Sequence, residues 1–533
     1  MSVYSIAIYV ILSLYLVLNF KYDLQMFQQN SYRLKRYFRW LKGDAGSSWR
    51  LVDVACLFLS MSTLLDFRLS ALVIAMVALT KIFLIFKRKS KKPLVFTSRV
   101  WRLYSVTGIL ALGGIAGAVF GLYGKEFWGY YPGAAMIVNC ILLMSIFSYI
   151  VVSIADIILM PVEWLNRRRY INDAKRILRS MPDLKVIGVT GSYGKTSTKH
   201  YLARILSEEF DTLITPGSFN TPMGVVRTIR EQMKPYNQIF VCEMGAKQVG
   251  DIKEICDIVH PSIGIVTAVG PMHLETFKSI DNVCRTKFEL VDALPTDGFA
   301  AINNDSDPCA ARNVKNVRAV RYGVTSKSGC DYYAKDVHYT ASGTSFVVKG
   351  PEGLEFDVKT QLLGEGNISD LLSAIVIALH LGMTPAKIRI AVASIQPVEH
   401  RLSIRQIPGN ITVIDDAFNS NPSGARMAAD VLAHFKEGRR IMITPGMVEL
   451  GARQAELNRE FGEYIGSDDR ADVIIIVGQT NRDALVKGVK TTDFNSDNLI
   501  VVDSFTEAQQ RLQPLLTPGA TVLYENDLPD SFK

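Results

Sequence analysis

The segment Lys185-Val-Ile-Gly-Val-Thr-Gly-Ser-Tyr-Gly-Lys-Thr-Ser-Thr198 determines how the soluble part of this chain folds. A short apolar strand, Val186 to Val189, leads into a glycine-rich turn, and a helix with one apolar face follows. The backbone N–H groups of such a turn and the N-terminus of the helix bind polyphosphate oxygens. We therefore predict an ATP site here. Its residues are Gly191, Ser192, Tyr193, Gly194, Lys195, Thr196 and Ser197.

The glycine spacing of this turn differs from the general P-loop, which has a glycine where Val189 stands. Gly188, Gly191 and Gly194 repeat every three residues instead. Lys195 is expected on the outer phosphates and Thr196 on Mg²⁺. The alternative is a turn before a buried helix with a chance lysine. That alternative leaves the order of strand, turn, helix and G-K-T unexplained.

Composition separates a membrane part from a soluble part. The chain has 533 residues, enough for about three domains, and the long uncharged runs fall in its first third. The net charge of +8 does not predict nucleic-acid binding, because much of the excess lies in short clusters between apolar runs. The seven cysteines show no C-x-x-C spacing, so neither a zinc site nor a disulfide framework is expected.

Five apolar stretches are long enough, or nearly so, to cross a bilayer, which needs about 20 residues per helix. They cover residues 2–20, 51–67, 69–86, 104–123 and 133–160. The second and third are close together and predict a tight helical hairpin. Buried core helices are the alternative for these two shorter stretches. The first stretch has no clear cleavage site, so it predicts an anchor rather than a removed signal peptide.

Basic residues predict the orientation of this membrane domain. Seven lie between Lys21 and Arg50, seven between Lys87 and Arg102, and three at Arg167–Arg169. The intervening turns carry only Arg68 and Lys125. By the positive-inside rule, five crossings place the N-terminus outside a bacterial-type inner (plasma) membrane. Everything after about residue 161 is then cytoplasmic, where ATP is available.

The remaining two-thirds predict an α/β fold in two parts. Strands and helices alternate from residue 185 to about 397, with strands ending at Glu243 and Thr267 and a glycine-rich β-hairpin excursion at about 320–360. A second alternation starts near His400 and predicts a separate open sheet. Its strands are expected at 412–414, 441–444, 473–477, 499–502 and 521–524.

Two side chains follow neighbouring strands of the first sheet. Glu243 ends one strand, and His273 follows the next. Open α/β sheets present ligands at the carboxyl ends of their strands. An acid near a P-loop threonine predicts a second Mg²⁺ contact. His273 by itself could equally be an ordinary surface or core histidine.

The order of motifs over about residues 185–525 resembles the Mur ligase family, most closely the branch that adds D-Ala-D-Ala to UDP-MurNAc-tripeptide. The matching pieces are C-E-M-G-A at 242–246, H-L-E at 273–275, K-F-E at 287–289, N-N-D at 303–305, G-N-I at 366–368, D-D-A-F-N-S-N-P at 415–422 and P-G-M-V-E-L-G at 445–451. The resemblance implies a P-loop central domain at 182–397 and a Rossmann-like C-terminal domain at 398–533. A membrane domain at 1–165 replaces the family's UDP-sugar-binding domain.

The resemblance also implies an ATP- and Mg²⁺-dependent amide ligase that works through an acyl phosphate. Lys195, Lys287 and His273 would be catalytic, and Thr196, Glu243, His273 and a carbamylated Lys287 would hold Mg²⁺. Without the resemblance, the sequence favours a solvated lysine on the surface of a helix at Lys287. The remaining matched positions are Asn367, Arg401, Asp415 and Asp416 for the nucleotide and Asn220 and Asn421 for substrate.

The departures from the family pattern concern the substrate more than the nucleotide. Gly366 and Asp370 stand where members usually have histidine and asparagine, and 524–530 lacks the usual K-G-S. We expect a carboxylate on a lipid-linked or polymeric envelope precursor, an amino acid or short peptide as the amine, and no nucleic acid. The alternatives are a poly-amino-acid capsule synthase-like ligase, a peptidoglycan-precursor ligase, an ATP-driven transporter and a non-catalytic scaffold.

Overall fold

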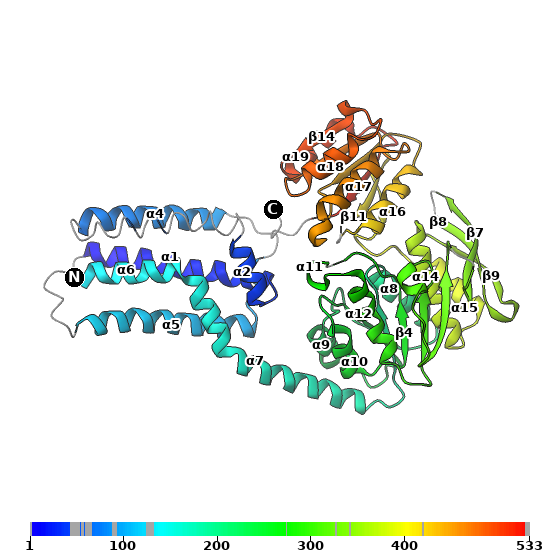
Figure 1. Cartoon of the computed structure of the whole chain (residues 1–533), viewed down its shortest axis with the longest axis horizontal. Helices are drawn as coiled ribbons and strands as arrows, with labels where there is room; N and C mark the ends of the chain where they lie inside the picture. Colours follow the sequence, from blue (N-terminus) through cyan, green and yellow to red (C-terminus); the bar gives the residue numbers. More distant parts are fainter. Residues whose placement is uncertain are drawn as a thin grey trace. The chain divides into compact units, whose positions relative to one another are not determined.

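The computed structural model describes residues 3–42, 54, 58, 67–87, 93–123, 133–272, 274–325, 328–340, 343–417 and 420–527 (Figure 1). The chain divides into two compact units, one ending at Arg168 and the other beginning at Arg169. The first unit is helical. The second contains two β-sheets with their covering helices and is described separately below.

The N-terminal unit consists mostly of long apolar helices, together with one short basic helix. They are α1 (Val3–Gln29), α2 (Leu34–Lys42), α4 (Phe67–Lys87), α5 (Ser98–Tyr123), α6 (Gly133–Ile146) and α7 (Ser148–Arg179). Three segments among the described residues are long and apolar enough to cross a membrane: Ile6–Gln29, Ser98–Gly117 and Ser148–Arg179. Ile137–Ile146 is a shorter apolar helix. Large apolar side chains such as Phe86 and Leu112, each 70% exposed, cover the outside of the unit.

The prediction of five spans is confirmed only in part. Stretch 69–86 is the helix α4, whereas 51–67 lies almost entirely outside the described residues. Stretch 133–160 is not one helix, because α6 ends at Ile146 and α7 begins at Ser148. Backbone bonds from Phe147 N to Leu143 O (2.9 Å) and from Val151 N to Phe147 O (3.1 Å) continue across this break. Residues 167–179 form the C-terminal part of α7.

The middle domain is built on a nine-stranded sheet with the order β2-β3-β1-β4-β5-β6-β7-β8-β9. The strands are β1 (Lys185–Thr190), β2 (Thr212–Ile214), β3 (Ile239–Glu243), β4 (Ile263–Val266), β5 (Phe299–Asn303), β6 (Arg318–Gly323), β7 (Tyr332–Thr340), β8 (Gly343–Lys349) and β9 (Glu355–Thr360). Neighbours from β2 to β7 run parallel, and β8 and β9 are antiparallel to their neighbours. The expected hairpin excursion at 320–360 therefore extends this sheet.

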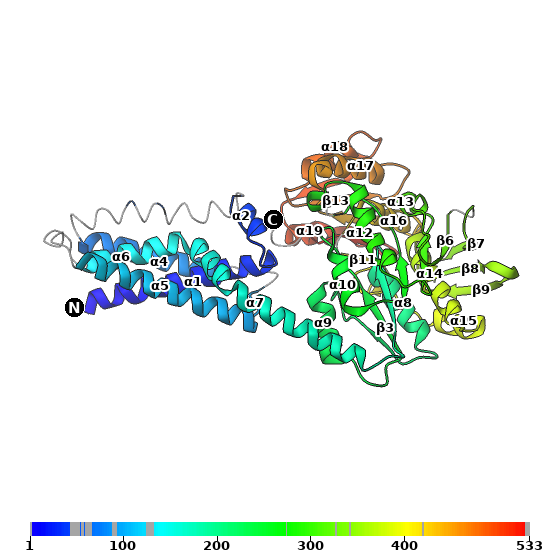
Figure 2. The same cartoon turned by 60° about the horizontal axis from the view of Figure 1, so that its bottom comes forward.

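Helices cover both faces of the nine-stranded sheet (Figure 2). Alternate residues of β1 enter different cores, with Ile187 and Val189 in one and Val186 in the other, as the pleat of a strand requires. One face packs against α8 (Lys195–Leu206), α14 (Glu365–His380) and α15 (Pro385–Ala393). The other packs against α9 (Pro222–Gln232), α10 (Asp251–Val259) and α12 (Ile280–Asp292). Both faces of β1, β3, β4 and β5 are buried, which explains their nearly uninterrupted apolar sequences, whereas β2 is partly exposed.

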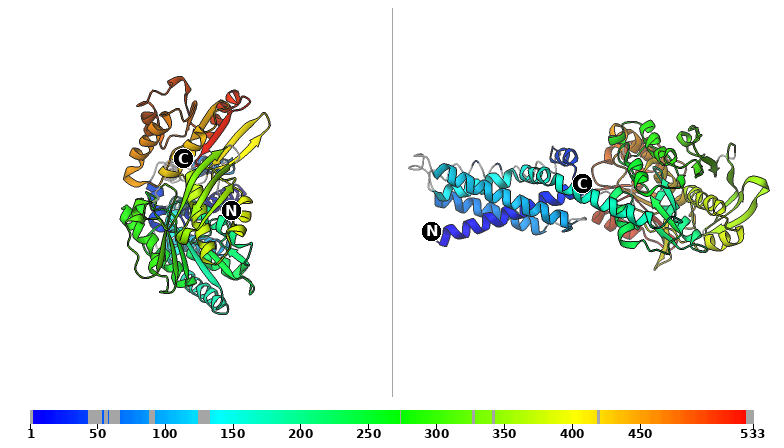
Figure 3. Two further views of the ribbon diagram at one scale, coloured as in Figure 1. Left: turned by 90° about the vertical axis from the view of Figure 1, so that its right-hand side faces the viewer. Right: turned by 90° about the horizontal axis from the view of Figure 1, so that it is seen from below.

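The C-terminal domain contains a six-stranded sheet with the order β10-β11-β15-β12-β13-β14 (Figure 3). Its strands are β10 (Ser403–Ile407), β11 (Ile411–Asp416), β12 (Arg440–Thr444), β13 (Val473–Val477), β14 (Leu499–Val502) and β15 (Thr521–Glu525). Only β10 is antiparallel to its neighbour. The helices are α16 (Pro422–Ala433), α17 (Gln454–Gly466) and α18 (Arg482–Val489) on one face and α19 (Phe505–Leu512) on the other. All five strands predicted for this part are present.

Candidate functional site

The glycine turn after β1 has room for backbone only. A Cβ atom on Gly191 would lie 2.0 Å from Thr267 Oγ1, and one on Gly194 would lie 2.1 Å from Asp370 Oδ1. Gly194 also has a φ of 77° and is the N-cap residue of α8, so it has no side chain to cap the helix. The first N–H groups of α8 are therefore available to anionic oxygens. The cradle fits a polyphosphate.

The loop after β4 holds this turn in place through hydrogen bonds. Ser192 N donates to Ala268 O (2.6 Å), and Gly270 N donates to Ser192 Oγ (3.1 Å). Tyr193 OH donates to Pro271 O (3.4 Å). Sequence reasoning assigned Ser192 and Tyr193 to the nucleotide, whereas the structure uses their side chains to join the P-loop to the neighbouring loop.

Lys195 is folded back over the turn. Its Nζ donates to Gly191 O (2.8 Å) and Ser192 O (3.0 Å). Burial lowers the pKa of this lysine to about 8, although the Glu243 carboxylate acts in the opposite direction. A phosphate beside the ammonium group would favour the charged form again.

Glu243 at the end of β3 is the centre of a buried polar cluster. Thr196 Oγ1 lies 3.1 and 3.2 Å from its carboxylate oxygens, Asn220 Nδ2 lies 2.9 Å away, and Lys199 Nζ lies 2.9 Å away. Burial by itself raises the pKa of Glu243, but Lys199 and Lys195 lower it overall. The carboxylate is therefore kept ionised beside the Thr196 hydroxyl, a pair of hard oxygen donors that suits Mg²⁺.

Lys199 is a site residue that sequence reasoning missed. Its side chain is fully buried, and its Nζ also donates to Gly217 O (2.6 Å). The signal was present in the sequence, because Lys199 lies four positions after Lys195 and neighbouring turns of a helix share a face.

Lys287 on α12 is not a solvated lysine. Its side chain is only 3% exposed, and burial holds its pKa well below the usual range, with Lys195 adding repulsion. Burial thus disfavours the charged form of this amine, and an amine that has lost its proton can act as a nucleophile. His273, predicted beside it, lies outside the described residues. The described residues contain no group of three or more His, Cys, Asp or Glu side chains placed to hold a metal.

Asn367 and Asp370 approach the P-loop from α14. Asn367 is buried, accepts a hydrogen bond from Tyr201 OH (2.9 Å) and donates to Leu363 O (2.8 Å). Burial raises the pKa of Asp370 to about 7, against the opposing charges of Arg401 and Lys195. Arg401 interacts electrostatically with Asp416, Glu243 and Asp370. Arg401 thus lies among carboxyl groups of the middle and C-terminal domains.

The carboxyl edge of the C-terminal sheet carries acids. Asp415 Oδ2 lies 2.8 Å from His400 Nδ1, and Asp416 Oδ1 accepts a hydrogen bond from Leu402 N (3.1 Å). Burial raises the pKa of Asp416 to about 6. Glu525, at the end of β15, is fully buried and accepts hydrogen bonds from the Ser420 and Thr444 hydroxyl groups. Burial raises its pKa to about 7.

The structure shows the contacts of Asn220 and Asn421, the two residues predicted to bind substrate. Asn220 Nδ2 contacts Glu243, so it lies in the predicted site. Asn421 is the N-cap of α16, and its Oδ1 accepts a hydrogen bond from Gly424 N (2.8 Å). Asn526, which sequence reasoning missed, donates to Gly446 O (2.6 Å) at the same edge.

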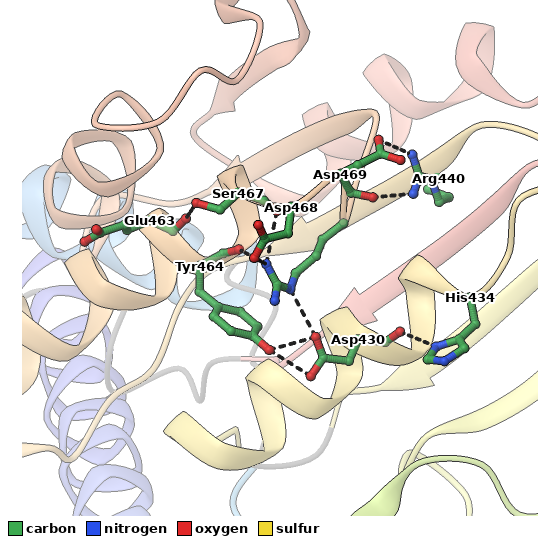
Figure 4. Close-up of polar contacts among 9 residues, drawn as sticks. Asp430, His434, Arg440, Glu463, Tyr464, Ser467, Asp468 and Asp469 are labelled. Carbon is green, nitrogen blue, oxygen red and sulfur yellow. Dashed lines mark hydrogen bonds and ion pairs between the residues drawn. The ribbon is translucent and has the colours of Figure 1, made fainter. Parts of the chain in front are cut away.

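A second polar region lies at the opposite, amino edge of the C-terminal sheet, where ion pairs fix the loop after α17 (Figure 4). Arg440 Nη2 lies 2.6 Å from Asp469 Oδ1 and 2.7 Å from Asp472 Oδ1. Tyr464 OH donates to Asp430 (2.7 Å), as Figure 4 also shows. These acids already have cationic or hydroxyl partners within the domain, so their role here is structural.

Comparison with known proteins identifies the family. Residues 189–378 match the Mur ligase middle domain, and residues 400–524 match the Mur ligase glutamate ligase domain. The chain belongs to the Mur ligase family. It is therefore an ATP-dependent ligase that forms C–N bonds. Mur ligases use ATP and Mg²⁺, and the glycine cradle and the Thr196–Glu243 pair fit both.

Two relatives illustrate the similarity in sequence. The UDP-N-acetylmuramoyl-tripeptide–D-alanyl-D-alanine ligase of Escherichia coli (strain K12) is 30% identical over 344 residues, which are 64% of this chain and 75% of that protein. The ligase of the same name from Bacillus subtilis (strain 168) is 26% identical over 62% of this chain and 69% of that protein.

Two solved structures show the same likeness. MurF from Acinetobacter baumannii has a TM-score of 0.62 at 27% identity, over 68% of this chain and 77% of that chain. The MurF ligase of Thermotoga maritima in complex with ADP has a TM-score of 0.61 at 25% identity, over 68% and 80%.

Proposed function

We propose that this Mur ligase is anchored in a membrane and joins an amino acid or short peptide to a carboxylate of a cell-envelope glycan or peptide precursor that is lipid-linked or polymeric. The observation that carries the proposal is the combination of two units in one chain. Residues 189–524 include both Mur ligase domains, and the unit ending at Arg168 contains three helices that could cross a membrane.

The first half of the proposed reaction transfers the γ-phosphoryl group of ATP to the carboxylate. A carboxylate oxygen forms a bond to phosphorus, and the bond to ADP breaks. Lys195 and the N–H groups at the start of α8 are placed to neutralise the transferring charge. Thr196 and Glu243 would hold Mg²⁺, while Lys199 and Asn220 hold Glu243. The chain's part in this step is positioning and charge neutralisation.

The second half forms the amide bond. The amine nitrogen attacks the acyl carbon, and the C–O bond to phosphate breaks with its electron pair on the phosphate oxygen. The nitrogen loses a proton. Asp415, Asp416 and Glu525 give one edge of the C-terminal sheet an acidic character that suits a cationic amine. We therefore assign the amine to this edge.

Lys287 is proposed to act as a carbamate. Once it has lost its proton, the amine would add to CO₂ and release a second proton, which gives an anionic oxygen ligand for Mg²⁺ in place of the amine. Full burial and the depressed pKa support this assignment. An unmodified ammonium group beside Mg²⁺ would be unfavourable.

The proposed membrane orientation gains support from contacts at one end of the helical unit. Gln28 near the end of α1 exchanges two hydrogen bonds with Val95 (2.9 and 3.0 Å), just before α5 begins. Arg99 and Arg102 at the start of α5 pair with Asp156 and Glu163 of α7 (3.1 and 2.7 Å). The basic segments after α1, before α5 and within α7 thus gather at one end. We propose that this end is cytoplasmic.

The decisive test uses the full chain in lipid nanodiscs. ATP consumption should require both a carboxylate acceptor and an amine, and phosphate and amide should appear in equal amounts. A second arm compares the full chain with residues 169–533, which keep Asp173 and its ion pair to Arg230 (2.7 Å). The shorter chain should bind ADP normally but lose most activity on a lipid-linked acceptor. Equal activity of both chains on a UDP-linked muramyl peptide would contradict a membrane substrate.

That last outcome would support a peptidoglycan-precursor ligase, which the similarity to UDP-N-acetylmuramoyl-tripeptide–D-alanyl-D-alanine ligases favours. A poly-amino-acid capsule synthase-like ligase would instead extend its product repeatedly with one amino acid. An ATP-driven transporter is less well supported. Charged side chains of the helical unit have partners on other helices: Lys81 Nζ donates to Tyr15 OH (3.0 Å), and Arg99 pairs with Asp156 (3.1 Å). These contacts hold the helices together.

A further inference from the structure

Helix α2 presents one charged face to the surroundings of the N-terminal unit. Its nine residues, Leu-Lys-Arg-Tyr-Phe-Arg-Trp-Leu-Lys, include four basic residues and no acidic residue. The exposed positions are Lys35, Phe38, Arg39 and Lys42. This i, i+3, i+4, i+7 spacing places them on one face of the helix.

The opposite face fixes α2 to the rest of the unit (Figure 2). Tyr37 is fully buried, lies edge-on to Phe27 of α1 (5.2 Å between ring centroids) and stacks with Trp40 (5.9 Å). Trp40 in turn contacts Tyr22 of α1 (6.1 Å). The exposed basic face is therefore held in place by packing.

A sharp turn between α1 and α2 sets the direction of α2. Ser31 and Tyr32 have φ values of 58° and 54°, and Tyr32 N donates to Phe27 O (3.0 Å). Two non-glycine residues in the left-handed region cost free energy, so surrounding contacts must hold them there. Gln28 Nε2 lies 3.0 Å from Tyr32 OH, and the Arg99 guanidinium lies over the Tyr32 ring (4.1 Å). This turn lies where α1, α2 and the start of α5 meet.

From this geometry we infer that α2 lies at the membrane surface and binds anionic phospholipid headgroups through Lys35 and Lys42. Lysines and arginines gathered on one face of a helix at a membrane surface are attracted to anionic lipids. Each basic residue near an anionic surface adds attraction, and phosphate is the complementary group. The inference uses the membrane placement proposed above but neither substrate of the ligase.

The test measures lipid selectivity of the full chain. The protein is reconstituted in nanodiscs of phosphatidylcholine and phosphatidylglycerol, and native mass spectrometry gives the ratio of the two lipids that it retains. Wild type should retain phosphatidylglycerol above its share of the bilayer. The double variant Lys35→Glu and Lys42→Glu should lower this preference about tenfold. The matched control, Lys487→Glu and Lys490→Glu, makes the same charge change at exposed lysines of the C-terminal domain.

Each result has one meaning. Loss of selectivity in the α2 variant alone, with ADP binding and helical content unchanged, supports the inference. A wild type without selectivity, or an equal loss in the control, overturns it. A chain that stays in solution without detergent or lipid overturns the membrane placement together with this inference. A single Phe38→Ala variant should leave the lipid selectivity unchanged, because it leaves the basic residues in place. A loss as large as that of the charge reversals would count against the inference.

Discussion

At the carboxyl edge of the middle sheet, lysines lie around the P-loop: Lys199 pairs with Glu243, Lys195 donates to the backbone of the turn, and buried Lys287 is close enough to Lys195 to be repelled by it. At the same edge of the C-terminal sheet, burial raises the pKa of the carboxyl groups of Asp416 and Glu525. Both edges arise from the same α/β architecture, in which parallel strands end together. The comparison teaches that one architecture can present opposite side-chain charge at this edge, which supports the proposal that one edge binds phosphate and the other binds the amine.

The strongest test of the cationic edge is Lys195→Ala. Loss of the ammonium group from the transferring phosphate should lower kcat by about 10²–10³-fold, since such contacts are worth roughly 3–4 kcal/mol in a transition state. Steady-state ATP-dependent ligation measures this. Lys185→Ala, at the exposed start of β1, should keep full activity. Near-normal turnover of Lys195→Ala would contradict the P-loop assignment.

The carbamate assignment is tested by Lys287→Ala. We expect almost no activity, and partial recovery with an excess of acetate or formate, because a small carboxylate can supply the missing oxygen ligand. Activity is titrated against added carboxylate, with chloride as the salt control. An active variant without additives would mean that Lys287 is only a packing residue.

The pH dependence of stability tests the role of Glu525 at the carboxyl edge of the C-terminal sheet. A carboxyl group whose pKa rises from 4.5 to about 7 on folding favours the folded state below pH 4.5, and this contribution is lost as pH rises through 7. The size of the shift corresponds to roughly 3 kcal/mol. Glu525→Gln should therefore lessen the fall in the thermal midpoint between pH 5 and 8. The exposed Glu437→Gln should leave the wild-type slope unchanged, and an unchanged slope in Glu525→Gln would refute the assignment.

Asp370→Asn restores the residue typical of the family and removes a carboxyl group from the lysine-rich edge of the middle sheet. Asp370 has a pKa of about 7, so it gains negative charge beside the P-loop as pH rises from 6 to 8. Wild-type ADP affinity should fall over this range, and the variant should bind about tenfold more tightly at pH 8. Titration calorimetry at both pH values measures this. Asp483→Asn, at an exposed position, is the control, and parallel pH profiles for wild type and Asp370→Asn would count against the effect.

The smallest effect is expected at Asn421. As the N-cap of α16, it should lose about 1 kcal/mol of stability on change to alanine but little on change to serine, which also caps helices. Denaturant unfolding measures this difference. If Asn421→Ser lowers kcat/KM as strongly as alanine does, Asn421 contacts substrate in addition to capping the helix.

The sequence by itself determined the alternation of strands and helices, the P-loop and the family. Those features depend on local patterns, such as buried β1 followed by Gly191, Gly194 and the G-K-T sequence, which are read along the chain. It also indicated Glu243, because strand ends of a parallel sheet share one edge. The apolar stretches were found in the same way.

Only the tertiary structure decided which charges meet. Lys199 contacts Glu243, which is 44 positions away in the sequence, and Glu525 contacts Ser420, which is 105 positions away. Asp370 lies next to Gly194. The break at Phe147 and the turn at Ser31 and Tyr32 also depend on packing between helices. Pairing and burial are set by contacts between distant segments, and burial changes the free energy of a charge by several kcal/mol. For that reason the sequence alone favours a solvated lysine at Lys287, whereas in the fold Lys287 is buried and its pKa is lowered.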